Sequence, residues 1–313
     1  MNVLVFGAGS LGSVVGGLMA KDGHTVTLVG RASHMAAVRD RGLCISGIWG
    51  EHHIANLRCV ESAEGLSRGN FDLIIVTVKS YDTRAAAEAI TPLVDDKTLV
   101  CSYQNGLGNA EVLAEVVGKQ QVFGARAIYG VWLPEPGHAE VTVIAQPTAL
   151  GTYDKGTSKD RVREIAEAMD AAGLPTVYTD RIATVLWAKV AYNCALNPMS
   201  ALLDVPYGEV GARADTRALI EEVVRELYAV GLGMGIALEP ATPEEYLELF
   251  FEKLLPPTAS HYASMREDFR RGRRTEIESL NGAIMSYGDE LGIPTPVNTT
   301  LTRLVKAREA GYL

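Results

Sequence analysis

The amino-acid sequence predicts an α/β fold, in which an N-terminal domain of alternating strands and helices precedes a C-terminal all-helical domain. Two observations support this prediction. At the N-terminus, the apolar run Asn2–Phe6 leads into a glycine-rich turn, a helical pattern and a second apolar run, Thr25–Val29. After Arg181 the pattern changes, and nearly every later segment has apolar residues at helical spacing.

The glycine-rich turn has the spacing of a dinucleotide-binding fingerprint. It reads Gly7-Ala8-Gly9-Ser10-Leu11-Gly12, and a helical pattern follows it as far as Gly23. Because strand, turn, helix and second strand form one short βαβ unit, we predict a Rossmann-type dinucleotide-binding domain rather than a turn without a ligand. The glycines allow a pyrophosphate to approach closely, and the helix N-terminus stabilises its charge.

The end of the second strand indicates which dinucleotide binds. An NAD site usually has an acidic residue there, which contacts the ribose 2′-hydroxyl. This chain instead has Gly30, Arg31, Ala32 and Ser33. Arg31 could form a charge-assisted contact with a 2′-phosphate, and Ser33 could add a hydroxyl donor. We therefore predict NADP(H) as the cofactor; the alternative is an ordinary surface arginine.

Two further strands are followed by polar side chains. The buried run Leu73–Val78 ends at Lys79, and Leu99–Ser102 leads into a glycine-rich turn that contains Asn105. Ligands of open α/β sheets bind at the carboxyl ends of the strands. Lys79 and Asn105 are thus expected to reach the same cofactor as Gly9, although each could also be an exposed loop residue.

The rest of the first half contains shorter β segments. Residues Leu43–Val60 are expected to form a small β excursion, and the amphipathic helix Lys159–Ala172 should close this half. Short strands are predicted at Val122–Tyr129, Glu140–Val143 and Ala149–Thr152.

We place the domain boundary at residue 181, giving a Rossmann-type NADP-binding domain, residues 1–181, and a helical substrate and catalytic domain, residues 182–313. Pro198 is expected to stop or kink the first helix of the second domain just after Asn197. Thr242 begins a capping box with proline at the first helical position. The predicted helices are Ile182–Asn197, Asp215–Met234, Pro243–Leu254, Glu276–Leu291 and Thr299–Glu309.

One helix face of the second domain combines a lone charge with two amides. Between Ile182 and Leu203 the only charged side chain is Lys189, and Asn193 and Asn197 follow it at intervals of four residues. Residues four apart share one helix face. A lysine among apolar neighbours is costly to bury without a partner or a function. The alternative is that Lys189 reaches the surface along its aliphatic stem.

Composition and charge exclude several classes of function. The formal net charge of −9 argues against nucleic acid or an anionic membrane as a partner. The four cysteines lack the spacing of a zinc site or a disulfide framework, so no metal is expected. No apolar stretch approaches the length of a membrane span, and no leader pattern is evident, so we expect a cytoplasmic protein.

Over nearly its whole length, the chain resembles the ketopantoate reductase (2-dehydropantoate 2-reductase) family. The specific element is the helix that carries Trp187, Lys189, Asn193, Asn197 and Pro198, because many dehydrogenases share the glycine turn. Further matches are Gly7–Gly12 with Arg31, Val76–Lys79, Gln104–Gly106, Ser264-Met265 and Arg274–Glu276.

The resemblance implies a role for each matched residue. Lys189 would be the proton donor, and Glu276 would be a catalytic residue that contacts the cofactor near its reactive end. Asn105 would touch both cofactor and substrate. The substrate would also be held by Asn193, Asn197 and Ser264.

The chemistry of these residue types fits the reduction of a 2-oxo acid. Hydride addition to the carbonyl carbon builds negative charge on the oxygen, which an ammonium group can stabilise and then protonate. The resemblance implies NADPH-dependent reduction of ketopantoate to pantoate in pantothenate biosynthesis, with a small-molecule partner and a possible homodimer. The alternatives are another branched or aromatic 2-oxo acid, or a non-catalytic NADP(H)-binding sensor.

Departures from the family pattern affect the expected substrate. Where the family usually has an asparagine between a proline and a glycine, this chain has Tyr207. Where it usually has an asparagine three residues before the serine, His261 precedes Ser264, and Val143–Gln146 replaces a usual His-Thr-Gly-like run. Tyr207 and His261 could still bind a hydroxyl, but they differ from asparagine in size and reach.

Overall fold

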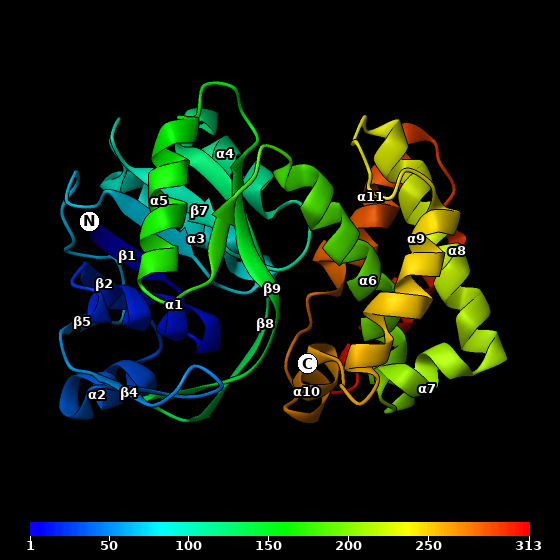
Figure 1. The fold of residues 1–313 in the computed structure, drawn as a ribbon, viewed down its shortest axis with the longest axis horizontal. Coiled ribbons are helices and arrows are strands. Elements are labelled where there is room, and N and C mark those ends of the chain that lie inside the picture. Colours follow the sequence, from blue (N-terminus) through cyan, green and yellow to red (C-terminus); the bar gives the residue numbers. More distant parts are fainter. The chain divides into compact units, whose positions relative to one another are not determined.

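The structure, a computed structural model, describes residues 1–313 and contains two compact units. The first comprises Met1–Asn105 and Asn109–Ile182, and the second comprises Gly106–Gly108 and Ala183–Leu313. The elements of both are labelled in Figure 1. None of the helices combines the length and hydropathy needed to cross a membrane.

The first unit is built on one ten-stranded sheet. Its centre is parallel, in the order β7-β6-β1-β2-β5, and β8 continues the parallel arrangement beside β7. Helices α1 (Ser10–Lys21) and α2 (Ala32–Arg41) follow the first two strands, as a doubly wound fold requires. The strands are β1 (Asn2–Phe6), β2 (Thr25–Val29), β5 (Leu57–Val60), β6 (Leu73–Val76), β7 (Leu99–Ser102) and β8 (Val122–Glu135).

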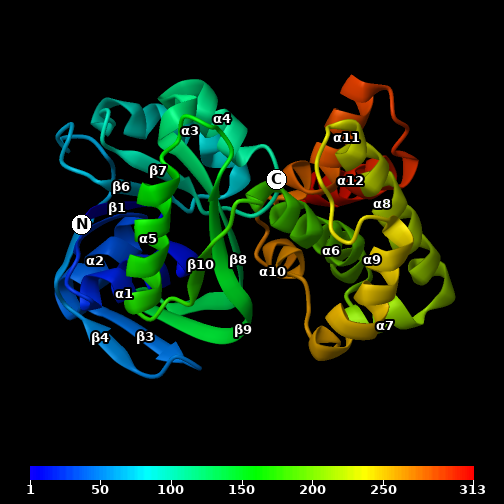
Figure 2. The same ribbon diagram turned by 45° about the horizontal axis from the view of Figure 1, so that its top comes forward.

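The strands bury both of their faces because helices cover each side of the sheet. Successive side chains of β1 alternate, so Val3 and Val5 face one core and Leu4 faces the other. The first core also receives α1, α2 and α5 (Lys159–Ala171), while α3 (Thr83–Ile90) and α4 (Asn109–Val117) pack into the second. Figure 2 shows α3 and α4 together on one side of the sheet.

Residues 43–60 form β-strands, as expected, but not a separate small excursion, because all three strands belong to the main sheet. β5 pairs with β2 at one edge of the sheet. At the other edge, β3 (Leu43–Gly47) pairs with β9 (His138–Thr152), and β4 (His52–Ile54) pairs with β3. The pairing partners lie far away in sequence, so the local pattern did not identify them.

All three segments predicted as short strands between residues 122 and 152 are strand, but they belong to two long strands instead of three short ones. β8 and β9 (His138–Thr152) form one long antiparallel hairpin with several register shifts. The first part of β9 pairs with β3, and its last part pairs with β10 (Thr176–Tyr178). Pairing with these separate partners keeps β9 extended through residues 144–148, where the sequence pattern predicts no strand.

The second unit is helical, as predicted, but several helix boundaries differ. The helix predicted from Glu276 begins at Asn281, after a short 3₁₀ turn, and the last helix begins earlier, at Pro296. Two helices, α7 and α10, are too short to give a periodic pattern. The seven α-helices are α6 (Ile182–Leu203), α7 (Tyr207–Ala212), α8 (Ala214–Gly233), α9 (Pro243–Leu249), α10 (Ser264–Arg270), α11 (Asn281–Leu291) and α12 (Pro296–Glu309).

The predicted capping box is confirmed at the start of α9. The Thr242 hydroxyl accepts from the Glu245 backbone N–H at 3.3 Å, and the Glu245 carboxylate accepts from the Thr242 N–H at 3.2 Å. The helix is shorter than predicted because it passes into a π-helical segment, Phe250–Leu254, after Leu249.

Pro198 does not stop α6, which continues to Leu203. A proline has no N–H, so the Cys194 carbonyl, four residues earlier, lacks its helical donor. The Asn281 side-chain amide donates to this carbonyl at 3.1 Å and to the Asn298 side-chain oxygen at 2.9 Å. Cys194 and Asn281 are both fully buried, so a Cys194 carbonyl without a donor would destabilise the folded protein.

The same polar chain continues to the start of α12. Glu226, buried on α8, accepts from the Asn298 side chain at 2.7 Å and from the backbone N–H groups of Val297 and Asn298 at 2.8 and 2.9 Å. A carboxylate at a helix N-terminus satisfies N–H groups that have no partner within the helix. One buried network thus connects α6, α8, α11 and α12.

We predict that Asn281→Ala lowers the free energy of unfolding by about 1–3 kcal/mol, because it leaves the buried Cys194 carbonyl without a donor. Pro198→Ala restores a backbone N–H at that position, so the loss should be smaller when Asn281→Ala is made in the Pro198→Ala background. Urea unfolding of the four proteins of this double-mutant cycle measures the difference. Equal losses in both backgrounds would contradict the account of Pro198.

Candidate active site

The glycine-rich turn connects β1 to α1 and leaves no room for side chains at two positions. Gly7 has a φ of +104°, and a Cβ there would lie 2.6 Å from the Val78 backbone nitrogen. A Cβ on Gly12 would lie 2.5 Å from the Thr77 hydroxyl oxygen. The turn therefore packs directly against the segment that follows β6.

The outer side of the same turn is open. Gly9 is exposed, and a Cβ on it would meet nothing closer than the Gly7 carbonyl oxygen at 3.8 Å. Gly9 is also the N-cap of α1 and provides no side-chain cap. The N–H groups of the first turn of α1 are thus available to an anion, and the glycine turn fits the pyrophosphate of a dinucleotide.

The end of β2 lies next to the glycine turn. The backbone N–H groups of Gly7 and Ala8 both donate to the Val29 carbonyl, at 3.0 and 2.7 Å. Arg31 is the N-cap of α2 and is exposed, and Ser33 is exposed in the first turn of that helix. No hydrogen bond or ion pair within the protein engages the Arg31 side chain, so its charge is available to a ligand.

A buried histidine fixes the start of α2. The Gly137 backbone N–H donates to His34 Nδ1 at 2.9 Å, so Nε2 carries the proton and can donate to the Ser13 hydroxyl oxygen at 2.8 Å. Burial lowers the pKa of His34, which favours this neutral form. His34 thereby ties α2 to α1 and to the turn between β8 and β9.

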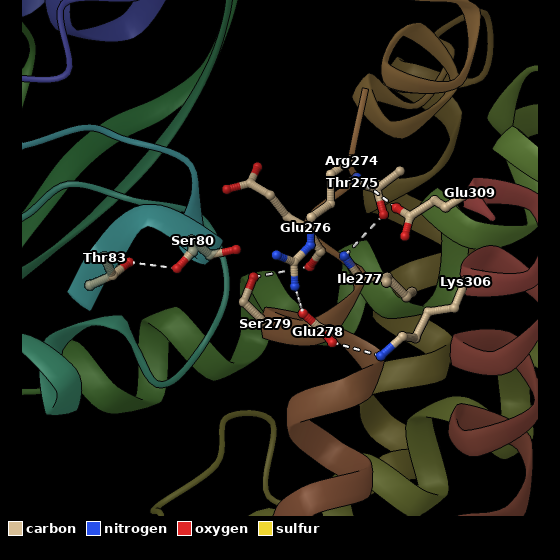
Figure 3. A network of polar contacts seen from close by, with 10 residues as sticks. All are labelled: Ser80, Thr83, Arg274, Thr275, Glu276, Ile277, Glu278, Ser279, Lys306 and Glu309. Carbon is tan, nitrogen blue, oxygen red and sulfur yellow. Dashed lines mark hydrogen bonds and ion pairs between the residues drawn. The ribbon is translucent and has the colours of Figure 1, made fainter. Parts of the chain in front are cut away.

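Side chains also tie down the loops after β6 and β7. The Gln104 amide donates to the Val78 carbonyl at 3.0 Å and to the Thr83 hydroxyl at 2.8 Å. Thr83 in turn donates to the Ser80 carbonyl at 2.8 Å (Figure 3). The Asn109 amide donates to the Asn105 carbonyl at 2.8 Å. These contacts hold the loops that contain Lys79 and Asn105.

Four predicted cofactor-binding positions therefore share one edge of the first unit. The glycine turn, Arg31, Lys79 and Asn105 follow β1, β2, β6 and β7, which are neighbours in the sheet. Strand β6 ends at Val76, so Lys79 lies three residues beyond it rather than directly at its end.

In the second unit, α6 carries the predicted substrate-binding face. Lys189 and Asn193 are half-buried and Asn197 is buried. The Asn193 side chain makes no hydrogen bond within the protein, although both of its polar atoms could. An asparagine on a half-buried face with its hydrogen-bonding groups unused suits a site that binds a polar ligand.

Tyr207 and His261, which depart from the family pattern, lie beside this face. The Tyr207 hydroxyl donates to Asn197 Oδ1 at 2.7 Å, and the Tyr207 backbone N–H donates to the His261 carbonyl at 2.9 Å. Burial raises the pKa of Tyr207, so its hydroxyl keeps its proton at neutral pH. Ser264 is the exposed first residue of α10.

The segment around Glu276 is held by α12 (Figure 3). The Thr275 backbone N–H donates to Glu309 Oε1 at 2.6 Å, and Glu278 pairs with Lys306 at 2.7 Å and with Arg274. The hydrogen bond from Lys306 lowers the pKa of Glu278. The buried Glu276 carboxylate extends away from these ion pairs. The contacts with α12 thus hold the backbone on either side of Glu276 and do not involve its carboxylate.

Sequence reasoning did not find two of these contacts. Tyr207 lies ten residues from Asn197, and Glu309 lies 34 residues from Thr275. Neither pair has a spacing that a helix or strand pattern would reveal. For Tyr207 the departure from the family pattern was the only signal, whereas Glu309 gave none.

Comparisons with known proteins agree with the fold. The ketopantoate reductase PanE/ApbA sequence profile matches residues 3–155, and the profile of its C-terminal domain matches residues 181–309. A 2-dehydropantoate 2-reductase of Aquifex aeolicus is 35% identical over 311 residues, which cover 99% of this chain and 97% of that protein.

Two solved structures are similar over the full chain. A PanE/ApbA family ketopantoate reductase from Ralstonia eutropha has a TM-score of 0.88 and 31% identity, and the match covers 100% of this chain and 99% of that one. D-mandelate dehydrogenase, solved with NADH and anilino(oxo)acetate, has a TM-score of 0.89 and 25% identity, with the same coverage of both chains.

Proposed function

The chain belongs to the ketopantoate reductase family, and from that premise we propose that it reduces ketopantoate to pantoate with NADPH. It is an oxidoreductase of the 2-dehydropantoate 2-reductase type. The observation that carries the proposal is the face of α6, where Lys189 is followed by Asn193 and Asn197. The full-length match to reductases favours an enzyme over a non-catalytic nucleotide sensor.

The proposed mechanism assigns proton transfer to Lys189. When bound, the reduced nicotinamide supplies the hydride to the carbonyl carbon of the 2-oxo acid. The Lys189 ammonium donates a hydrogen bond to the carbonyl oxygen, stabilises the negative charge that grows there and then gives up its proton. Glu276 would be the second catalytic group and would contact the cofactor.

The remaining polar residues hold the two ligands. Asn193, Asn197 and Ser264 would bind the acid through hydroxyl and amide groups, which add no charge. The glycine turn and Lys79 would bind the cofactor, and Asn105 would contact both ligands. The support for these roles is position: the cofactor residues follow neighbouring strands of the sheet, Asn193 and Asn197 lie on the α6 face, and Ser264 is the exposed first residue of α10.

Lys189→Ala should lower the turnover number by a factor on the order of 10²–10⁴, which is the usual contribution of a general acid. Binding of NADPH, measured by its fluorescence, should persist because the glycine turn is unchanged. Lys253→Ala, which removes an exposed lysine of the same unit, is the matched control. Retention of most of the turnover by Lys189→Ala would exclude the proton-donor role.

NADPH is proposed as the cofactor because Arg31, exposed at the tip of β2, replaces the acid of an NAD site. Arg31→Ala should raise the KM for NADPH by about 10- to 100-fold, the effect expected when a charge-assisted contact is lost. The KM for NADH should change little. Arg39→Ala, which removes an exposed arginine of the same helix, is the control. Equal use of both cofactors by the parent protein would refute the assignment.

An aromatic 2-oxo acid is the second candidate substrate. The similar D-mandelate dehydrogenase was solved with anilino(oxo)acetate, and this chain has an aromatic ring, Tyr207, where the family usually has an amide. Such a substrate would leave the proposed roles of Lys189 and Glu276 unchanged and alter only the acid that is preferred.

The decisive measurement is kcat/KM for a panel of acids at saturating NADPH: ketopantoate, its deoxy analogue and phenylglyoxylate. The kcat/KM for ketopantoate should exceed that for the deoxy analogue by more than about tenfold, because a site built to bind a hydroxyl rejects a substrate that lacks it. A strong preference for either of the other acids would overturn ketopantoate as the substrate and leave the reductase activity in place.

A further inference from the structure

We propose that Tyr207 is a positioning residue that fixes the orientation of the Asn197 amide, so that Asn197 presents its N–H donors to an oxygen atom of the bound 2-oxo acid. This inference rests on the proposed function, because it assigns a more specific task to a residue of the same substrate face. Its starting point is the hydrogen bond of 2.7 Å from the Tyr207 hydroxyl to Asn197 Oδ1.

Two backbone hydrogen bonds hold Tyr207 in place. Its N–H donates to the His261 carbonyl at 2.9 Å, and the N–H of Gly208 donates to the Ala259 carbonyl at 2.8 Å. A Cβ on Gly208 would lie only 3.0 Å from that same carbonyl oxygen, so the two segments are in close contact. Tyr207 therefore cannot move away without breaking these contacts.

The ring of Tyr207 is fixed as well. Tyr192 meets it edge-on, with the ring centroids 6.0 Å apart and an angle of 83° between the planes, and Phe250 packs against Tyr192 at 5.4 Å. Edge-to-face packing of this kind stabilises the ring in the position that it occupies. The hydroxyl of Tyr207 is thereby held against Asn197.

The direction of the hydrogen bond follows from the surroundings. The buried Tyr207 hydroxyl has no acceptor in the protein other than Asn197 Oδ1, and leaving its proton without an acceptor would be costly. The hydroxyl stays protonated because burial raises its pKa. Asn197 must therefore turn its oxygen toward Tyr207 and its Nδ2 away from it.

Nδ2 of Asn197 has no partner inside the protein, yet it is not sealed from solvent, since it is not among the buried polar atoms that lack a hydrogen bond. Asn193, one turn earlier on the same face, also has its amide unused. An asparagine normally offers either a donor or an acceptor to a ligand. Here Tyr207 leaves only the donor, which selects a carboxylate, carbonyl or hydroxyl oxygen.

The test is the affinity of the complete protein, loaded with NADP⁺, for ketopantoate and for its deoxy analogue, measured by calorimetry. Without hydride to transfer, these complexes do not turn over, so the result is independent of catalysis. The variants are Tyr207→Phe, which removes only the hydroxyl, and Asn197→Asp, which replaces Nδ2 by an oxygen. Tyr192→Phe is the matched control, because its hydroxyl contacts Thr258 instead of Asn197.

Tyr207→Phe should raise the Kd by about two- to tenfold, the size expected for one neutral hydrogen bond, whereas Tyr192→Phe should not change it. Asn197→Asp should weaken binding more, because a carboxylate repels the oxygen of the acid. A loss confined to ketopantoate assigns Nδ2 to its hydroxyl, and an equal loss for both acids assigns it to the carboxylate or carbonyl. Both results support the proposal.

Unchanged affinity in Tyr207→Phe, or binding by Asn197→Asp as tight as that of the parent, would overturn the proposal. So would a parent protein that binds neither acid. A parent that binds both acids and reduces neither with NADPH would refute the proposed function alone. The affinities of its variants would still decide the role of Tyr207.

Discussion

The carbonyl oxygen of Cys194 is the acceptor on which the arrangement of the helical unit depends. Pro198 cannot donate to it, the Asn281 amide donates in its place, and α6 continues to Leu203. There Asp204, with a φ of +56°, turns the chain so that Tyr207 comes back beside Asn197. A helix that stopped at Asn197 would place Tyr207 elsewhere, so the proposed substrate face depends on the buried polar network that lets α6 continue.

In the first unit, some features could be predicted from neighbouring residues, whereas others depend on residues far away in the chain. The β1–α1–β2 unit could be predicted because its signals, a continuous apolar run and a glycine turn that leads into a helical pattern, follow one another directly in the sequence. The partners of β3 and β5 could not, because register across a sheet depends on strands far away in the chain. The sequence did place Arg31, Lys79 and Asn105 on one edge of the sheet, because the carboxyl ends of parallel strands lie at the same edge.

The same limit holds for the candidate site. Lys189, Asn193 and Asn197 could be grouped from spacing on one helix, and the start of α9 at Thr242 from a capping pattern. What orients those side chains comes from elsewhere: Tyr207 reaches Asn197 across a turn, and Glu309 holds Thr275 from another helix. Sequence patterns identify chemical groups, whereas their orientation depends on contacts that form only in the folded chain.

The short segment Gly106–Gly108 has a consequence for how the chain can be divided. It lies in the first half of the sequence but belongs to the helical unit, where the Leu107 N–H donates to the Ser279 carbonyl at 2.8 Å and its side chain joins the helical core. A helical fragment cut out at residue 183 would lack this piece. Exchange of helical units between relatives would therefore need a two-part graft that carries the loop after β7 along with α6–α12.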